Sequence, residues 1–101
     1  MPGKPFVTCR VTQVYQTGVC VYFYLGLTDE GLEHPLETYG ALEAAARDEI
    51  LNRGGSLSHH HGIGKRRQRF LARVLSPAAL TWARAVKQAT DPTNVFGIGN
   101  L

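Results

Sequence analysis

The sequence has little cysteine, no long apolar run and no apolar leader. Cys9 and Cys20 are the only cysteines in 101 residues, and without a CxxC spacing they make neither a disulfide framework nor a zinc knuckle. No apolar stretch approaches the roughly 20 residues of a transmembrane helix. The opening "MPGKPFVTCR" lacks the apolar segment of a signal peptide. We therefore expect reduced, buried cysteines and no mark for export or for a membrane.

The net charge of the chain is also small. The chain has 11 Lys and Arg against 8 Asp and Glu, a formal net charge of +3. This excess is local, because basic residues cluster from Lys65 to Arg73 while most acidic residues lie upstream of them. A net charge this small does not predict nucleic-acid binding. With 44% hydrophobic and 19% charged residues, the composition is that of one globular domain rather than a disordered chain.

Two strands are expected near the start of the chain. The alternating, β-branched run Phe6–Tyr15 predicts a half-buried strand, and the almost unbroken apolar run Val19–Leu27 predicts a strand covered on both faces. Together they indicate an antiparallel hairpin, and residues 56–60 could return as a short third strand. The chain has little material to cover the second strand twice, which suggests a missing partner.

Three helices are expected after the hairpin. The first spans Pro35–Arg53 and ends at the glycines that follow, the second lies in the basic run after Gly64, and Ser76 caps a third that ends near Thr90. The side chains expected to face inward are Leu36, Tyr39, Leu42, Ala46, Ile50, Phe70, Leu71, Val74, Trp82, Ala85, Val86 and Ala89. The order β-β-α-β-α-α predicts an α+β fold, a small antiparallel or mixed sheet with helices packed on one side.

The segment "GGSLSHHHGIGKRR" places His59, His60 and His61 between glycine pairs. An affinity tag is terminal, and a zinc site needs further converging ligands, for which His34 alone remains. Structural histidines held by hydrogen bonds and acid–base groups active near neutral pH both stay open. In an extended segment His59 and His61 would share one face while His60 points the other way.

Two further features carry candidate sites. "GIGK" fails as a phosphate loop because His59 stands where the first glycine is needed and Arg66 follows Lys65. The basic run is then a solvated helix face or an anion contact. In "VYFY", Tyr22 and Tyr24 share a strand face, where core packing and a hydroxyl aimed at a pocket are both open.

Three segments together carry a family resemblance: "CRVTQVYQTGVCVYFY", "EAAARDEILNRGGSLSHHHGIGK" and "DPTNVFGIGNL". They resemble the C-terminal end of the alkyldihydroxyacetonephosphate synthase family, within the vanillyl-alcohol-oxidase type of FAD-dependent proteins. The resemblance covers essentially the whole chain. The closing DPTN turn is shared more widely among FAD-linked oxidases than the histidine segment is.

The resemblance implies an FAD-dependent transferase that exchanges the acyl chain of acyl-dihydroxyacetone phosphate for a long-chain alcohol in ether-lipid synthesis. The flavin would serve as an electron sink, without net redox. By the same resemblance Tyr22 and His60 would be the catalytic acid–base groups. His59, His61 and Lys65 would contact substrate or cofactor, and no metal is implied.

The resemblance also implies that residues 1–101 are the C-terminal portion of an FAD-linked oxidase C-terminal domain, within a larger substrate-binding (cap) domain. The FAD-binding domain would lie upstream and hold most of the FAD, so this piece alone would be inactive. Expected partners are the two substrates, a peripheral membrane contact and a second copy in a homodimer, without nucleic acid. The compartment would be cytoplasmic in a bacterium and peroxisomal in a eukaryote.

Three alternatives to this interpretation remain. The first is a piece of another FAD-linked oxidase or dehydrogenase acting on hydroxy acids or alcohols. The second is a binding module without catalysis. The third is a nucleic-acid contact through Lys65–Arg73, which would show a steep dependence on salt.

Overall fold

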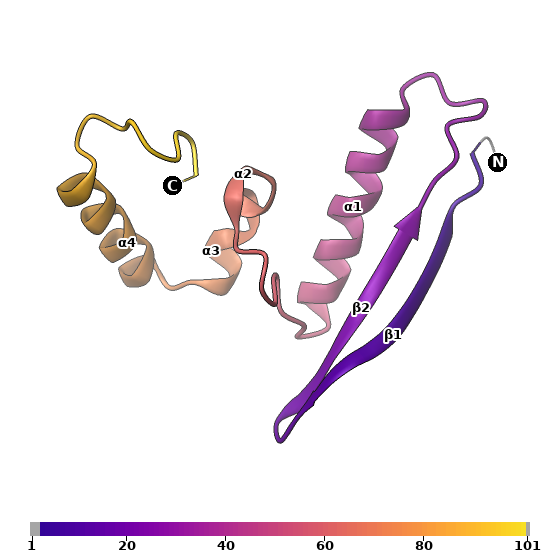
Figure 1. Cartoon of the computed structure of the whole chain (residues 1–101), viewed down its shortest axis with the longest axis horizontal. Coiled ribbons are helices and arrows are strands. Elements are labelled where there is room, and N and C mark those ends of the chain that lie inside the picture. The colour runs from indigo at the N-terminus through magenta and orange to yellow at the C-terminus, as the bar shows by residue number, and fades with distance from the viewer. Residues whose placement is uncertain (1–2, 101) are drawn as a thin grey trace. The chain divides into compact units, whose positions relative to one another are not determined.

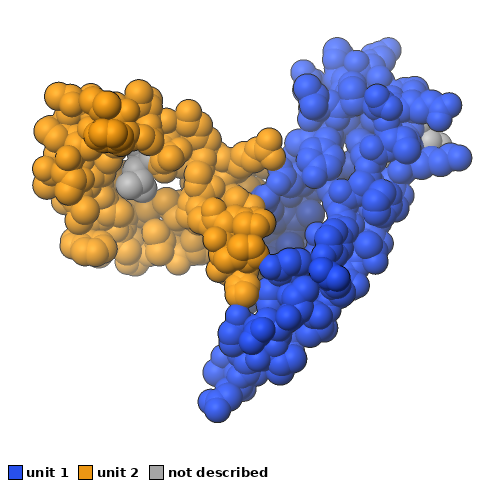
Figure 2. Space-filling model, viewed as in Figure 1, with its two compact units in different colours: residues 1–55 blue, residues 56–101 orange. Residues whose placement is uncertain are grey.

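The chain forms two compact units in a computed structural model that describes residues 3–100. Residues Met1–Gly55 make the first unit and Ser56–Leu101 the second, coloured blue and orange in Figure 2. Across the described residues, no helix combines the length and apolar character needed to cross a membrane.

The first unit begins with the predicted hairpin. Strands β1 (Phe6–Tyr15) and β2 (Gly18–Gly26) pair antiparallel and are joined by a tight turn (Figure 1). β-Branched and aromatic residues fill both strands, which suits an extended, pleated backbone. A two-stranded antiparallel sheet followed by helices confirms the predicted α+β class.

A β-bulge interrupts the hairpin ladder. Val11 pairs with Val21, but the next partner pair is Gln13 with Cys20, so Thr12 is an extra residue on β1. The Thr12 hydroxyl donates a hydrogen bond to the Cys20 carbonyl oxygen over 3.3 Å. This bond gives the extra residue a partner where the regular ladder slips, and a bulge of this kind increases the local twist.

The hairpin leaves much of its apolar surface exposed. Val19 is 55% and Phe23 59% exposed, so β2 is not covered on both faces as its sequence predicts. Cys9 is exposed and Cys20 half-buried, and the expectation that both thiols are buried is therefore wrong for Cys9.

Helix α1 (Pro35–Asn52) has the predicted start and end. Pro35 occupies the first turn, where its missing N–H costs no hydrogen bond. At the other end the Arg53 N–H donates to the Glu49 carbonyl, and Gly54 follows with φ +79°, a conformation that glycine adopts without strain.

Most of the α1 side chains that were predicted to face inward are exposed, so that prediction is wrong for them. Leu36 is 88% exposed, and Tyr39, Leu42 and Ala46 are exposed as well; Ile50 alone among them is half-buried. The half-buried side of the helix consists of Pro35, Thr38, Glu43, Ala44, Arg47, Ile50 and Leu51. A Glu43–Arg47 ion pair one turn apart runs along this side, so long charged side chains cover it where an apolar stripe was expected.

The second unit opens with bends instead of the predicted third strand. Residues 56–63 contain no strand. The Ser56 hydroxyl donates to the Ser58 carbonyl over 2.9 Å, a local bond that competes with strand pairing. Gly62 has φ +73° and Gly64 φ +56°, which lie outside the extended region of the backbone map. The serines and glycines of this segment thus favour turns over the short strand that its length allowed.

Short helical pieces and one longer helix complete the second unit (Figure 1). The basic run forms α2 (Gly64–Arg67), a 3-10 turn η1 (Gln68–Phe70) and α3 (Leu71–Val74), where a single short helix was predicted. Helix α4 (Pro77–Thr90) has the predicted bounds. Its Ser76 cap is confirmed, because the hydroxyl oxygen accepts a hydrogen bond from the Ala79 N–H over 3.2 Å.

Three apolar side chains form the buried core of the described residues. Leu57 is 8%, Phe70 4% and Leu71 8% exposed, which confirms the inward placement of Phe70 and Leu71. Val74, at 42% exposed, does not belong to the core.

The predicted stripe on α4 also faces solvent. Trp82 is 73% and Val86 45% exposed. The half-buried side carries Leu80, Ala83 and Lys87 instead. Lys87 lies on this side because its ammonium group is held by the segment that follows the helix.

Residues 91–100, called the closing turn below, are organised by one carboxylate. The Asp91 side chain accepts hydrogen bonds from the N–H groups of Val95 and Phe96, each over 2.9 Å. Lys87 donates to the same carboxylate and to the Phe96 carbonyl. The Lys87 hydrogen bond, followed by the two backbone N–H groups, lowers the pKa of Asp91 to about 2.

The closing turn is expected to loosen in acid. Because the folded-state pKa of Asp91 is depressed, its contribution is complete above the ordinary value near 3.8 and is lost as the pH falls through about 2. We expect the amide resonances of Val95 and Phe96 to shift with a midpoint near pH 2 in an NMR titration. Asp91→Asn should abolish this transition. A wild-type midpoint near pH 4 would contradict the bonded carboxylate.

Loss of the Ser76 cap is expected to destabilise the start of α4. Ser76→Ala removes the acceptor of the Ala79 N–H and should cost about 1 kcal/mol. Hydrogen exchange of the Ala79 amide should then be about fivefold faster. Ser76→Asp retains an acceptor and should exchange like the wild type, whereas equal exchange in all three proteins would show that the cap is unimportant.

Candidate functional site

The three histidines form a cluster with edge-to-face ring contacts in the bends before α2. The ring centroids of His59 and His60 lie 5.4 Å apart at an interplanar angle of 80°, and those of His60 and His61 lie 4.1 Å apart at 73°. His60 is therefore next to both neighbours, and the expectation that it points away from them is wrong. The bent backbone of this segment, in contrast to a strand, brings successive side chains together.

The cluster lowers the basicity of its central member. Desolvation by the surrounding atoms lowers the pKa of His60 from its usual 6.5, and the electrostatic effect of His61 and then of His59 lowers it further. All three side chains are nevertheless exposed. His60 is therefore a neutral imidazole at neutral pH, the form that accepts a proton.

Arg67 supports the segment from α2, a role that sequence reasoning missed. Its guanidinium donates to the Gly62 carbonyl over 3.4 Å, directly after the last histidine, and the residue is half-buried. The basic run was interpreted as a solvated face or an anion contact. The half-buried arginine two positions after Lys65 shows that one member of the run braces the histidine segment instead.

Lys65 lies in the first turn of α2, four residues after His61, and its side chain is exposed. The stem of Lys65 approaches the backbone of Gly99 in the closing turn. Four of the five predicted site residues, His59, His60, His61 and Lys65, thus fall within one seven-residue segment of the second unit.

Tyr22 lies in the first unit, half-buried at the centre of β2 opposite Arg10. Tyr24, two residues along the same strand face, is 41% exposed, and the Arg10 guanidinium carbon lies 5.6 Å from its ring centroid. The structure therefore separates the two tyrosines by burial. The predicted juxtaposition of Tyr22 with the histidines stays a prediction, because the two belong to different units.

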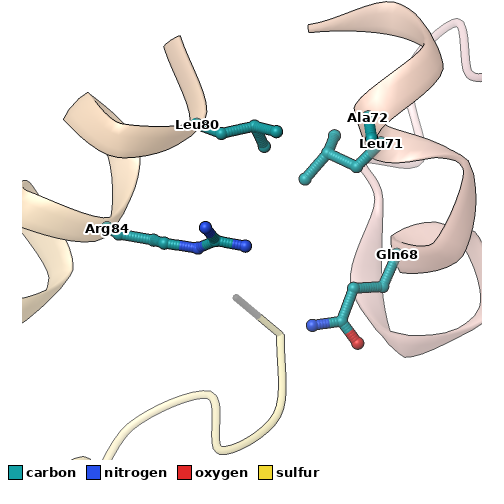
Figure 3. Close-up of a pocket in the computed structure, with 5 residues that line it drawn as sticks. All are labelled: Gln68, Leu71, Ala72, Leu80 and Arg84. Carbon is teal, nitrogen blue, oxygen red and sulfur yellow. The ribbon is translucent and has the colours of Figure 1, made fainter. Parts of the chain in front are cut away.

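None of these five residues lines the hollow found in its own unit. In the second unit a pocket of about 90 Å³ is lined by Gln68, Leu71, Ala72, Leu80 and Arg84 (Figure 3). Such a volume equals roughly three water molecules and is too small for a flavin ring or an alkyl chain. In the first unit a more open hollow of about 430 Å³ is lined by Leu27, Thr28, Asp29, Pro35, Leu36 and Tyr39. Among the described residues, no three His, Cys, Asp or Glu side chains are placed to hold a metal.

Comparison with known proteins identifies the family. A model of the C-terminal domain of FAD linked oxidases matches residues 3–101. The chain belongs to this family. The predicted membership of the FAD-linked oxidases is thereby confirmed.

Three known proteins are similar in sequence to most of this chain. Alkyldihydroxyacetonephosphate synthase of Caenorhabditis elegans is 48% identical over 93 residues, covering 92% of this chain and 16% of the relative. The synthase of Trypanosoma brucei brucei is 29% identical over 97 residues, 95% of this chain and 16% of the relative. Glycolate oxidase subunit GlcD of Escherichia coli (strain K12) is 31% identical over 110 residues, 98% of this chain and 21% of the relative. The predicted resemblance to the synthases is confirmed, and the chain spans about a sixth of their length.

The lowered pKa of His60 can be tested by removing its neighbours. In an NMR titration of the imidazole protons, His60 should titrate below 6.5, because desolvation and two adjacent imidazoles disfavour its charged form. Replacing both neighbours, His59→Gln and His61→Gln, should raise the His60 pKa. His34→Gln removes the histidine outside the cluster and should leave it unchanged. An unaltered His60 midpoint in the double variant would contradict the proposed electrostatic effect.

Proposed function

We propose that this chain is the C-terminal part of an FAD-dependent alkylglycerone-phosphate synthase-like transferase. The reaction replaces the acyl chain of acyl-dihydroxyacetone phosphate with a long-chain alcohol, breaking the carbon–oxygen bond to the leaving carboxylate and forming the ether bond. The observation that carries the proposal is the 48% identity to a synthase over 92% of the chain, against 31% to the glycolate oxidase subunit.

His60 is the central acid–base group of this proposal. A neutral imidazole at neutral pH can take a proton at the reacting carbon and return it later in the exchange, while the hydroxyl proton of the incoming alcohol is released together with the leaving carboxylate. His59 and His61 each lie edge-to-face with the His60 ring and so restrict its orientation. The side chains of His59 and His61 are exposed, as contact with substrate or cofactor requires.

Tyr22 is the second acid–base group in the proposal. Its half-buried position in the middle of β2 restricts the side chain more than that of the exposed Tyr24. A phenolic hydroxyl can both donate and accept a hydrogen bond, as proton transfer to or from the leaving carboxylate requires. The proposal needs the complete protein to bring Tyr22 and the histidine segment to one substrate.

FAD would supply an electron sink at the reacting carbon. The chain offers polar side chains for contact with it, the exposed histidines and the exposed Lys65. The pocket of about 90 Å³ in the second unit is too small for the flavin ring. These residues therefore fit the role of contacts at the edge of the cofactor, while most of the FAD is bound by an upstream domain.

The long chain of the alcohol leads to expectations about the partners and the compartment of the complete protein. A long-chain alcohol resides in membranes, so we expect a peripheral membrane contact in the complete protein, together with a homodimer. Peroxisomes are the expected compartment in a eukaryote and the cytoplasm in a bacterium. Nucleic acid is not an expected partner.

A second candidate is an FAD-linked oxidase acting on a hydroxy acid or alcohol. The 31% identity to the glycolate oxidase subunit over 98% of the chain supports it. This oxidase would reduce its flavin when given the hydroxy acid alone, with no acyl donor present. The transferase would leave its flavin oxidised under the same conditions.

Substitution of the two acid–base groups tests the transferase directly. In the complete protein that contains this chain, His60→Ala and Tyr22→Phe should each lower the exchange rate by about 10²–10⁴-fold, because each removes a positioned proton donor or acceptor. The measurement is incorporation of an isotope-labelled long-chain alcohol into the ether product. The visible absorbance spectrum should show that both variants still hold flavin.

Matched controls come from the same chain. His34→Ala removes a histidine outside the cluster, and Tyr24→Phe removes the exposed hydroxyl on the same strand face as Tyr22. Both should exchange at nearly the wild-type rate. Full exchange activity of His60→Ala, or an equal loss of activity in His34→Ala, would contradict the acid–base role of His60.

A further inference from the structure

The second unit carries far more positive charge than it can neutralise. Residues 56–101 contain seven Lys and Arg but a single acidic side chain, a formal charge of +6. That acid, Asp91, is already bonded to Lys87 and to two backbone N–H groups. The side chains of the unit as a whole therefore carry a net positive charge. Such an excess attracts anions.

Lys65 is the member of this set whose stem lies against the closing turn. Its stem runs past Gly99, so close that a methyl group on Gly99 would lie 3.3 Å from the Lys65 Cε and 3.9 Å from its Nζ. Gly99 has φ +79°, a conformation that disfavours any other residue. Figure 1 shows the yellow C-terminal segment returning from the end of α4 toward α2, where Lys65 lies.

Gly99 is itself held by the closing turn. Asp91 fixes the start of the turn through Val95 and Phe96, and the Asn100 N–H donates to the Gly97 carbonyl over 3.0 Å at its end. The backbone beside Lys65 is thus tied through hydrogen bonds to α4. Restricting a long side chain before it binds reduces the entropy lost on binding.

We propose that Gly99 is a positioning residue for Lys65, and that the Lys65 ammonium held there binds a phosphate group. A compact ammonium binds phosphate as a point charge, and the arginines at positions 66, 67, 69 and 73 strengthen the local positive field. The assignment of that phosphate to the substrate rests on the proposed function. The coupling of Gly99 to Lys65 does not.

A double-mutant cycle in the complete protein tests the proposal. Lys65→Met keeps the stem length without the charge, and Gly99→Ala places a methyl group against the stem. Each should weaken binding of inorganic phosphate, measured by isothermal titration calorimetry, by about tenfold. The double variant should bind no more weakly than Lys65→Met alone, since Gly99 acts through Lys65. Additive losses would overturn the positioning role.

The matched control is Gly97→Ala. Gly97 lies in the same turn at φ +58°, but a methyl group there would meet the flexible Asn100 side chain at 3.2 Å, away from Lys65. It should bind phosphate like the wild type. If it matches Gly99→Ala, backbone strain in the turn explains the loss and the proposal fails. Should Gly99→Ala not fold, an NMR contact between the Gly99 Hα and Lys65 Hε protons in the wild type decides the geometry.

Kinetics then separate the two sources of phosphate. If the substrate supplies it, Lys65→Met should raise KM for acyl-dihydroxyacetone phosphate about tenfold with little change in kcat or FAD content. If the cofactor supplies it, FAD content should fall while KM is unchanged. Unchanged phosphate binding, KM and FAD content together would refute the site. If Gly99 and Lys65 remain coupled in phosphate binding but the complete protein has no exchange activity, the proposed function is contradicted and the phosphate site is not.

Discussion

Burial of Leu57, Phe70 and Leu71 is the constraint on which the second unit depends. Each fully buried leucine or phenylalanine side chain contributes roughly 1.5–3 kcal/mol, and these three are the core of the described residues. Leu57 lies two residues before the histidine cluster, and the other two lie where η1 meets α3, within the helical run that starts after the cluster. The cluster is therefore held at both ends by apolar burial, while its own side chains remain exposed.

Local signals in the sequence predicted the local structure well. The β-branched hairpin, the proline start and glycine end of α1 and the Ser76 cap depend on neighbouring residues, and all are present. The predicted faces failed where tertiary partners decide them. Leu36 and Trp82 have helical apolar spacing, yet they are 88% and 73% exposed. Periodicity shows which residues share a face but cannot show that anything covers it.

The candidate site was predicted in the same uneven way. The histidine types and their glycine flanks were evident from the sequence, as was Lys65. The edge-to-face contacts of His60 with both neighbours were not evident, because they depend on bends, whereas residues 56–60 were expected to be an extended strand. Arg67 was hidden among five similar basic residues, because only the backbone course shows which of them reaches the Gly62 carbonyl. The closeness of Gly99 to Lys65 joins positions 34 residues apart, which no short-range pattern encodes.

The β-bulge at Thr12 has a consequence for how this hairpin behaves while its apolar side chains are exposed. Both strands of a two-stranded sheet are edges, and a long, flat, apolar edge invites pairing with other chains. The extra residue twists β1 away from flatness and interrupts the regular row of donors and acceptors. A second hairpin could not extend the ladder in register past this point, so the same irregularity that shapes the strand also protects it against fibrillar stacking.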